Sequence, residues 1–351
     1  MTNSVQIDSD IRLLVDSFFD KKKYSQVVVL TDRNTRVQCY PLAAKSIPGH
    51  EIIEIEAGET YKNIDTCQVI WQRMTDLRLD RHALLVVLGG GVLGDMGGFC
   101  AATYKRGIDF LLLPTTLLSQ VDASVGGKLA IDFNGIKNHI GVFQLPVATL
   151  IGTEFLKTLP FRELRSGFAE VIKHCIIGDR KMWDEIRKKD LAAQDWQTVI
   201  RHSVEFKWQV VTEDPKEKGR RKILNFGHTI GHALETYFLE TKDRLYHGEA
   251  IAAGMIAESF IARKKGLITA DEEAQIVSYL DKIYGRIKVS NDPQIMEIMR
   301  QDKKNKGNKI LMALPQGIGN ATWDVEVSEE QVIESLSFLN NLPAGRHAHY
   351  R

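Results

Sequence analysis

The sequence has no uninterrupted apolar run that approaches the roughly 18 residues of a membrane span. Its first residues have no basic region followed by an apolar core, so we expect no secretory signal and a cytoplasmic location. Cysteine is scarce, and its residues are scattered without C-x-x-C spacing: Cys39, Cys67, Cys100 and Cys175. This usage favours reduced thiols that behave as small buried apolar residues.

Net charge is also nearly absent, because 46 Lys and Arg residues against 45 Asp and Glu residues leave a formal charge of +1. No global field therefore draws the chain to nucleic acid or to an anionic membrane, and we expect neither as a partner. Any anion site must be local. The chain itself, with 351 residues of which 44% are apolar, is long enough for two domains, each with its own core.

The first half alternates short β-rich runs with polar or helical stretches. The runs cover residues 26–32, 50–58, 83–91 and 109–116. Because they are apolar almost throughout, they predict strands of a parallel α/β sheet that is covered on both faces. Each run ends in polar or glycine-rich residues, and the carboxyl ends of such strands border the ligand crevice of an open sheet. We expect the four endings to converge on one bound molecule.

From about Thr153 the pattern changes to long segments of helical periodicity, with little alternation of strand type. We therefore predict an α/β N-terminal Rossmann-like domain followed by an all-α C-terminal domain, with the boundary near the FLKTLP segment. The predicted limits are 1–155 for the first domain and 156–342 for the second. Residues 343–351 are expected to be a disordered tail.

The segment LLVVLGGGVLGDMGGF places Gly89, Gly91 and Gly94 in a G-x-G-x-x-G pattern directly after a strand-like run. A glycine turn that opens a helix offers bare N–H groups and a positive dipole end to a pyrophosphate, although a tight turn explains the glycines equally well. The loop follows the third strand, and no strand ends in an acid about 20 residues later, as a standard dinucleotide fold requires. Polar residues that could hold a ribose lie upstream, in TDRNT and AGETYK.

A second constellation combines histidines with a carboxylate. His228 and His232 lie four residues apart on one helical face, His247 begins another expected helix, and Glu170 lies in a largely apolar helical stretch. Histidines with one carboxylate are the ligand set of a catalytic zinc, so we predict a metal site in the second domain. The spacing alone does not say which histidines bind the metal.

Cationic and amide side chains form a third group, which we expect to face an anion. Lys128 and Lys137 lie in a glycine-rich segment with Asp122 and Asn138, and Arg221 leads directly into the histidine helix. The lysine-rich run at 302–309 is more typical of a solvated surface.

Taken in series, GGGVLGD, PTTLLSQVDASVGGK, GFAEVIKH, LNFGHTIGHALE and HGEA make the chain resemble the 3-dehydroquinate synthase family of sugar phosphate cyclases. The resemblance implies a dehydroquinate synthase-like fold that binds NAD and zinc, with cobalt as an alternative metal. The NAD contacts it implies are Asp32, Asn34, Glu59, Lys62, Gly90, Gly91, Val92, Leu93, Gly94, Asp95, Thr115, Thr116, Lys128, Lys137, Phe155 and Thr158. The implied zinc ligands are Glu170, His228 and His247, so that His232 faces the substrate instead.

The implied substrate contacts are Asp122, Lys128, Asn138, Lys173, Lys207, Arg221, Asn225, His232 and either Lys303 or Lys304. Arg106 matches an arginine that reaches the phosphate site of the partner subunit, which implies a homodimer. The implied reaction converts 3-deoxy-D-arabino-heptulosonate 7-phosphate to 3-dehydroquinate and phosphate. One departure is Lys128-Leu129-Ala130, where the family usually has Lys-Thr-Gly, and this leaves the local turn open.

Three rival hypotheses remain at this point. A sister cyclase would act on a neutral sugar phosphate such as glucose 6-phosphate or sedoheptulose 7-phosphate, and would not need the cations Lys207 and Arg221 with Asn225. A metal-dependent polyol dehydrogenase of related architecture would accumulate NADH. A non-catalytic dinucleotide-binding module would have no need of a metal.

Overall fold

The structure is a computed structural model that describes residues 5–123, 125–239, 241–287, 289, 293–300 and 310–342. The chain forms two compact units. The first contains Met1–Leu164 and Trp196–Trp208, and the second contains Arg165–Asp195 and Gln209–Arg351. The limits 1–155 and 156–342 stay predictions. Within the described part of the chain, no helix has the length and apolar character needed to cross a bilayer.

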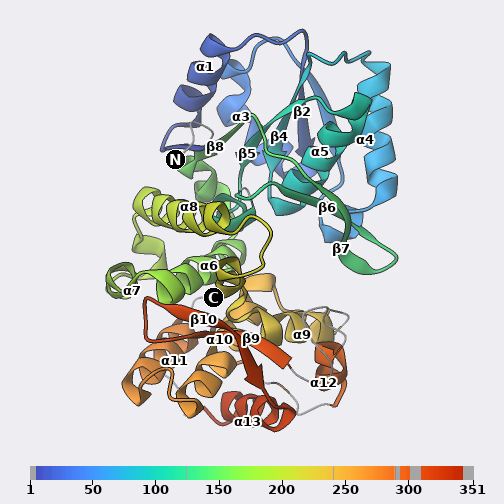
Figure 1. Ribbon diagram of the computed structural model, residues 1–351. Helices are drawn as coiled ribbons and strands as arrows, with labels where there is room; N and C mark the ends of the chain where they lie inside the picture. The colour runs from blue at the N-terminus through green and yellow to red at the C-terminus, as the bar shows by residue number, and fades with distance from the viewer. Residues whose placement is uncertain are drawn as a thin grey trace. The chain divides into compact units, whose positions relative to one another are not determined.

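The first unit is built on a six-stranded sheet with the order β1-β8-β5-β4-β2-β3, in which all pairs are parallel (Figure 1). Its strands are β1 (Val5–Asp8), β2 (Val27–Asp32), β3 (Glu51–Ile55), β4 (Leu84–Gly89), β5 (Asp109–Pro114) and β8 (Ala148–Gly152). The parallel sheet predicted from the four apolar runs is therefore confirmed, and those runs form β2 to β5. The two strands β1 and β8 were not predicted.

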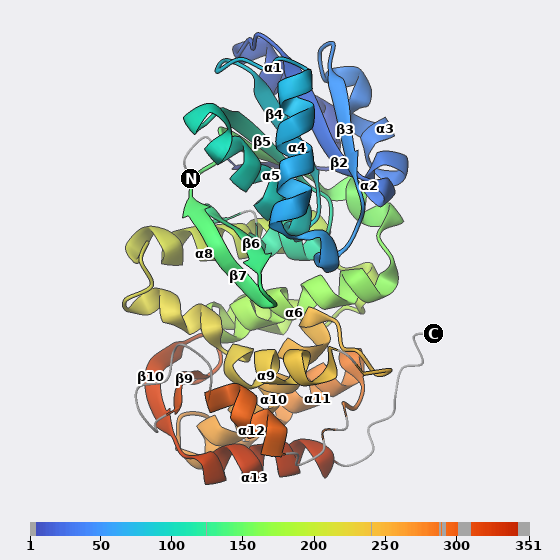
Figure 2. The same ribbon diagram turned by 90° about the vertical axis from the view of Figure 1, so that its right-hand side faces the viewer.

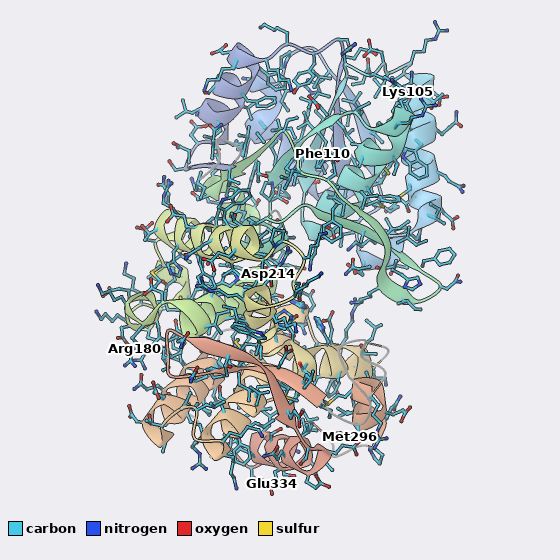
Figure 3. All side chains as sticks on the ribbon, in the orientation of Figure 1. Lys105, Phe110, Arg180, Asp214, Met296 and Glu334 are labelled. Carbon is cyan, nitrogen blue, oxygen red and sulfur yellow. The ribbon has the colours of Figure 1, made fainter. Side chains whose placement is uncertain are left out.

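Helices cover both faces of this sheet, as Figures 1 and 2 show. They are α1 (Ile11–Lys21), α2 (Arg33–Gln38), α3 (Tyr40–Ala43), α4 (Ile64–Asp76) and α5 (Gly91–Thr103). One apolar core packs α4 and α5 against one face, where Phe110 lies (Figure 3). A second core packs α1 and α3 against the opposite face. Strands buried on both sides explain why β2 and β4 are apolar almost throughout.

The strand order reverses beside β2. The chain passes from β2 outward to the edge strand β3, and then returns to place β4 on the other side of β2. An open α/β sheet binds its ligand outside the carboxyl ends of the strands at such a switch point. Asp32 ends β2 and Gly89 ends β4, so both flank this position.

A two-stranded antiparallel hairpin, β6 (Lys128–Phe133) and β7 (Ile136–Phe143), completes the description of the first unit. Leu129 and Ile131 of β6 are buried and join the core beneath α5. β7 is exposed along nearly its whole length.

The second unit is mainly helical. The helices that belong to it wholly or in part are α6 (Phe161–Gly178), α7 (Arg180–Ile186), α8 (Trp196–Glu213), α9 (His228–Phe238), α10 (His247–Lys264), α11 (Ala270–Tyr284), α12 (Pro293–Arg300) and α13 (Glu329–Asn340). The predicted helical second half is confirmed. A two-stranded antiparallel sheet that the sequence did not predict, β9 (Ile310–Pro315) and β10 (Ala321–Val327), lies within it.

Candidate functional site

The glycine loop of the first unit has the predicted strand, turn and helix. β4 ends at Gly89, Gly90 is the N-cap of α5, and α5 begins at Gly91. No side chain caps this helix, and a narrow cavity lined in part by Gly90, Gly94 and Asp95 lies beside its first turn. Unsatisfied N–H groups at the positive end of a helix favour an anionic ligand such as a pyrophosphate.

A buried lysine connects this loop to the β6–β7 hairpin. Lys62 is 4% exposed, and its Nζ donates to Asp95 Oδ2 and to Asn138 Oδ1, both at 2.7 Å. Burial raises the pKa of Asp95, and the charge of Lys62 opposes that increase. Asn138 has a positive φ of 50°. The structure thus brings together two predicted cofactor residues and one predicted substrate residue.

Three further predicted cofactor residues lie around Cys39. Its thiol is buried, and the nearby hydroxyl groups of Thr158 and Thr115 slightly offset the effect of burial on its pKa. Burial, with a smaller contribution from the charge of Asp32, raises the pKa of Cys39 to about 11. The thiol is therefore protonated at neutral pH and acts as a packing group beside these three residues.

The other predicted cofactor residues differ in exposure. Asn34 is exposed and Glu59 is half-buried, whereas Leu93 and Phe155 are buried in the apolar cores. A cofactor contact at Leu93 or Phe155 must therefore use the main chain. Thr116 forms a closed turn with Ser119, in which its Oγ1 donates to Ser119 Oγ at 3.0 Å.

Lys207, although distant in sequence, belongs to the first unit and neutralises Asp122. Its Nζ donates to the Asp122 main-chain oxygen and to Oδ1, both at 2.6 Å, and its side chain is 9% exposed. The two predicted substrate residues thus form a tight pair. Lys128 and Lys137 lie on the exposed faces of β6 and β7.

In the second unit, three helices bring a carboxylate and two imidazoles together. Glu170 on α6 is 1% exposed, and its Oε1 lies 3.4 Å from His228 Nε2 and 3.5 Å from His247 Nε2. A tetrahedral site with bonds of about 2.0–2.2 Å has ligand-to-ligand edges of about 3.3–3.6 Å. The described residues therefore fit a divalent cation at this point.

The outer nitrogen of each imidazole is held by an acceptor. His228 Nδ1 lies 3.0 Å from the Phe226 carbonyl oxygen, and His247 Nδ1 lies 3.1 Å from Glu235 Oε2. Because neither oxygen can donate, each Nδ1 carries the hydrogen and each Nε2 points toward Glu170. Metal-binding histidines typically have this arrangement.

Electrostatic interactions set unequal protonation within the cluster. Burial alone raises the pKa of Glu170, but the ion pair with Lys173 and the nearby His228 hold it well below its usual range. Burial lowers the pKa of His228. For His247 burial acts in the same direction, but Glu170 and Glu235 outweigh it and raise its pKa to about 9. In the metal-free protein at neutral pH, His247 is the protonated member.

The comparisons with known proteins cover nearly the whole chain. Residues 52–166 match the family described as 3-dehydroquinate synthase N-terminal, and residues 167–305 match the family described as 3-dehydroquinate synthase C-terminal. A 3-dehydroquinate synthase from Parabacteroides distasonis is 37% identical over 342 residues, which covers 95% of this chain and 97% of that one. The chain belongs to the 3-dehydroquinate synthase family.

Solved structures agree with this membership. A 2-deoxy-scyllo-inosose synthase in complex with carbaglucose-6-phosphate, NAD+ and Co2+ is 26% identical, with a TM-score of 0.85 and 95% of each chain covered. The 2-epi-5-epi-valiolone synthase from Streptomyces hygroscopicus subsp. jinggangensis, with NAD+ and Zn2+ bound, is 25% identical, with a TM-score of 0.84 and 97% of each chain covered. The fold predicted from the resemblance to this family is confirmed.

Predicted substrate residues of the second unit lie near the metal cluster or on the segment before it. The ring of His232 lies 5.0 Å from that of His228, measured between centroids. Lys173 pairs with Glu170. Arg221 is 4% exposed, and its guanidinium donates to the Pro215 carbonyl oxygen at 2.9 Å.

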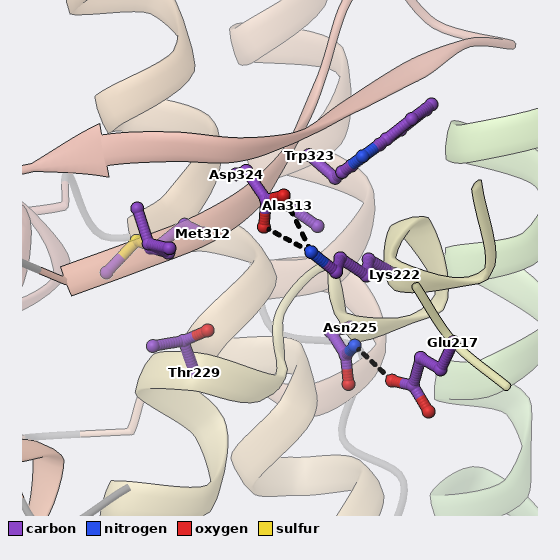
Figure 4. Close-up of a pocket in the computed structure, with 9 residues that line it drawn as sticks. Glu217, Lys222, Asn225, Thr229, Met312, Ala313, Trp323 and Asp324 are labelled. Atoms are coloured by element: carbon purple, nitrogen blue, oxygen red, sulfur yellow. Dashed lines mark hydrogen bonds and ion pairs between the residues drawn. The ribbon is translucent and has the colours of Figure 1, made fainter. Parts of the chain in front are cut away.

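Asn225 lines a cavity of about 250 Å3 between the segment before α9 and the β9–β10 sheet (Figure 4). Its Nδ2 donates to Glu217 at 2.8 Å, while Lys222 pairs with Asp324. Glu217 was not among the predicted residues, and no feature of its loop sequence indicates a role.

Glu235 was also missed, although a signal for it exists. It follows His228 by seven residues on the same helix, so it lies on the same face. An acid at that spacing beside two histidines is a candidate partner for an imidazole.

Two further predictions concern the lysines of the 302–309 run with the C-terminal tail, and the departure at Leu129-Ala130. Lys303, Lys304 and the tail at 343–351 lie outside the described residues. Leu129 is 4% exposed and packs in the core, so the departure at Leu129-Ala130 replaces a hydroxyl with apolar packing inside a regular strand.

Proposed function

We propose that this chain is a 3-dehydroquinate synthase, a carbon-oxygen lyase that converts 3-deoxy-D-arabino-heptulosonate 7-phosphate to 3-dehydroquinate and inorganic phosphate. The reaction proceeds by oxidation at C4, elimination of phosphate, reduction at C4, ring opening and intramolecular aldol closure. It is the second step of the shikimate pathway, which leads to chorismate and the aromatic amino acids. The observation that carries the proposal is the cluster of the buried Glu170 with the half-buried His228 and His247 in a chain of this family.

Glu170, His228 and His247 are the proposed ligands of a divalent cation, zinc or cobalt, and the glycine loop with Lys62 and Asp95 is the proposed NAD site. When bound, the cation supplies Lewis-acid polarisation of the substrate hydroxyls, and NAD supplies a reversible hydride acceptor. The other NAD contacts that the resemblance to the family implies complete the proposed NAD site. The first of them in the chain is Asp32 and the last is Thr158.

The protein's own residues bind and orient an anionic substrate. The proposed contacts are Asp122, Lys128, Asn138, Lys173, Lys207, Arg221, Asn225 and His232. Lys207, Lys173 and Arg221 are all buried, so their positions are fixed before substrate arrives. Preorganised donors contribute most where charge moves during a reaction, as it does when phosphate leaves. Lys207, Arg221 and Asn225 are all present in the chain, and a neutral sugar phosphate would not need them, so they favour the acid substrate.

We further propose a cytoplasmic homodimer in which Arg106 reaches the phosphate site of the partner subunit. Arg106 is exposed in a short turn with a positive φ of 67°, next to Lys105 on the surface (Figure 3). The β6–β7 hairpin of the same unit and the residues just after it expose apolar side chains that a second copy would cover: Phe133, Ile136, Ile140 and Phe143 on the hairpin and Leu145 after it. The four cysteines are reduced and buried, as suits the cytoplasm.

The activity is tested by phosphate release from the heptulosonate phosphate with NAD present, with and without chelator, while NADH absorbance is followed in the same cuvette. We expect metal-dependent phosphate release with flat NADH. Steady NADH production would show a dehydrogenase instead. Faster turnover of glucose 6-phosphate or sedoheptulose 7-phosphate would assign the chain to a sister cyclase.

Subunit mixing tests the role of Arg106. R106A and E170Q are each expected to be inactive, but a mixed dimer has one site with its own Glu170 and the partner's intact arginine. Random mixing makes half of the dimers mixed, so about a quarter of wild-type activity should return. No recovery after subunit exchange, shown by mass spectrometry, would place Arg106 within its own subunit's site.

A further inference from the structure

Glu258 is a carboxylate in the interior of the second unit that the proposed reaction does not use. It lies on α10 and is 0% exposed. Its Oε2 accepts a hydrogen bond from the Gly227 N–H at 2.6 Å, and its Oε1 accepts one from the Ile230 N–H at 3.1 Å. These two donors flank His228 in the chain. Both oxygens of the carboxylate therefore hold the segment that presents a proposed metal ligand.

Helix α9 needs such a partner because its own sequence provides no cap. Its N-cap is Gly227, which has no side chain and a positive φ of 78°. The first N–H groups of a helix lack intrahelical partners, and a nearby negative charge stabilises the positive end of the helix dipole. Glu258 supplies from a neighbouring helix what Ser or Asp at the N-cap supplies elsewhere.

The two helices approach closely enough for this contact because glycines lie between them. A Cβ added at Gly254 would overlap the Gly227 carbonyl oxygen, and one added at Gly231 would lie 3.1 Å from the Ala250 carbonyl oxygen. The same helix, α10, begins with His247. Helix α10 thus carries the proposed ligand His247 at its start and Glu258 about three turns later. Glu258 in turn holds the start of α9, which carries the proposed ligand His228.

We infer that Glu258 is a positioning residue of the metal centre. By fixing the first turn of α9, it sets where His228 Nε2 lies relative to Glu170 and to His247, and so preorganises the ligand set for the metal. This inference rests on the proposed metal site. Residues that orient metal ligands typically contribute 10- to 100-fold in metal affinity.

The test compares E258Q with a matched control, E273Q. Glutamine keeps the size of the side chain but turns an NH2 group toward one of the two N–H donors. Glu273 lies in the same unit and is also buried, but it belongs to α11. It pairs at 2.6 Å with Arg263, near the end of α10. The apo forms are titrated with Co2+ against a chromophoric chelator, and the visible spectrum of the bound Co2+ is recorded. Far-UV circular dichroism reports the fold.

We expect E258Q to raise the Kd for Co2+ about tenfold or more and to change the Co2+ spectrum, while E273Q changes the Kd less than about twofold. E258D, which keeps the charge on a shorter side chain, should fall between wild type and E258Q. An unchanged Kd and spectrum in folded E258Q would overturn the inference. If neither E258Q nor E258D folds while E273Q does, Glu258 is required for folding itself and the inference is also overturned. Failure of the wild type to bind Co2+ would instead overturn the proposed metal site.

Discussion

The proposed cofactor site and the proposed metal site are built from different parts of the chain. In the first unit the site consists largely of main-chain N–H groups at the start of α5, where a strand ends and a glycine turn follows. In the second unit it consists of side chains from α6, α9 and α10, which are distant in sequence and buried together. A main-chain site depends on where the chain turns, whereas a side-chain site depends on the identity and protonation of each group.

The two units should therefore differ in which substitutions they tolerate. The loop should tolerate a small side chain that does not block the N–H groups. The metal cluster should not tolerate even an isosteric change, because each side chain supplies a ligand atom or a compensating charge.

The largest effect is expected for E170Q, which replaces the buried carboxylate with an amide of equal size. Loss of the charge removes one ligand and leaves Lys173 without its partner, so turnover should fall at least about 1,000-fold. The first unit should be unaffected, and NAD affinity measured by calorimetry should stay within about twofold of wild type. A comparable loss of NAD affinity would show that the two sites are not independent.

A smaller but still large effect is expected for K62M in the first unit. Removing the buried lysine leaves the half-buried Asp95 without its cation, which should cost about 3 kcal/mol in the free energy of unfolding measured with urea. The matched control is K22M, which breaks an exposed pair with Asp109 of the same 2.7 Å length and should cost less than about 1 kcal/mol.

The sign of the pH dependence of K62M follows from the pKa of Asp95. Burial already raises that pKa, and loss of Lys62 raises it further. A raised carboxyl pKa gives stability that is present at low pH and lost as pH rises through the folded-state value. The deficit of K62M should therefore shrink on acidification. A deficit that grows in acid would contradict this reading of the cluster.

Metal affinity should change about tenfold per pH unit. The pKa of His247 is about 9 in the metal-free protein, and its Nε2 must lose a proton before it binds a metal. The association constant for Co2+ should therefore rise with pH between about 6.5 and 8. E235Q removes one of the two carboxylates that raise this pKa, so its pH dependence should shift to lower pH. An affinity for Co2+ that does not depend on pH would mean that His247 is already neutral in the metal-free protein.

The smallest effect is expected for G90A. An added methyl group would lie 3.1 Å from Thr116 Cγ2, so a shift of a few tenths of an ångström would accommodate it, and the φ of −73° suits any residue. NAD affinity should fall no more than about fivefold, or ~1 kcal/mol. A loss of 100-fold would show that the pyrophosphate packs directly against this Cα.

Some features of both regions were predictable from residue patterns because the signal is local. The apolar runs of β2 to β5 and the glycine turn predict the sheet and the start of α5, since strand burial and helix opening depend on neighbouring residues. The strand β1 has only four residues, too few to establish a period, and β8, like β1, was not predicted. The β9–β10 sheet was missed although its strands have six and seven residues, because the second half was interpreted as helical throughout.

The metal cluster shows the limit of local patterns more clearly. The spacing of His228 and His232 suggests a ligand pair, yet the atoms that meet Glu170 are on His228 and His247. Only the packing of three helices determines which imidazoles converge, and the resemblance to a family, not the spacing, indicated the set that the structure brings together. Glu258 gives no sequence signal at all, because its partner is a main-chain segment 28 to 31 residues away.

The interleaved composition of the two units has a consequence for synthesis on the ribosome. The central sheet is complete once β8 has emerged, but the cofactor unit still lacks residues 196–208, which supply the lysine that neutralises Asp122. When residues 196–208 are made, the ribosome has already made α6, which carries the proposed metal ligand Glu170. The N-terminal unit is therefore complete only after residue 208 has been made, and a gene truncated after residue 164 should yield a protein in which Asp122 lacks its contact with Lys207.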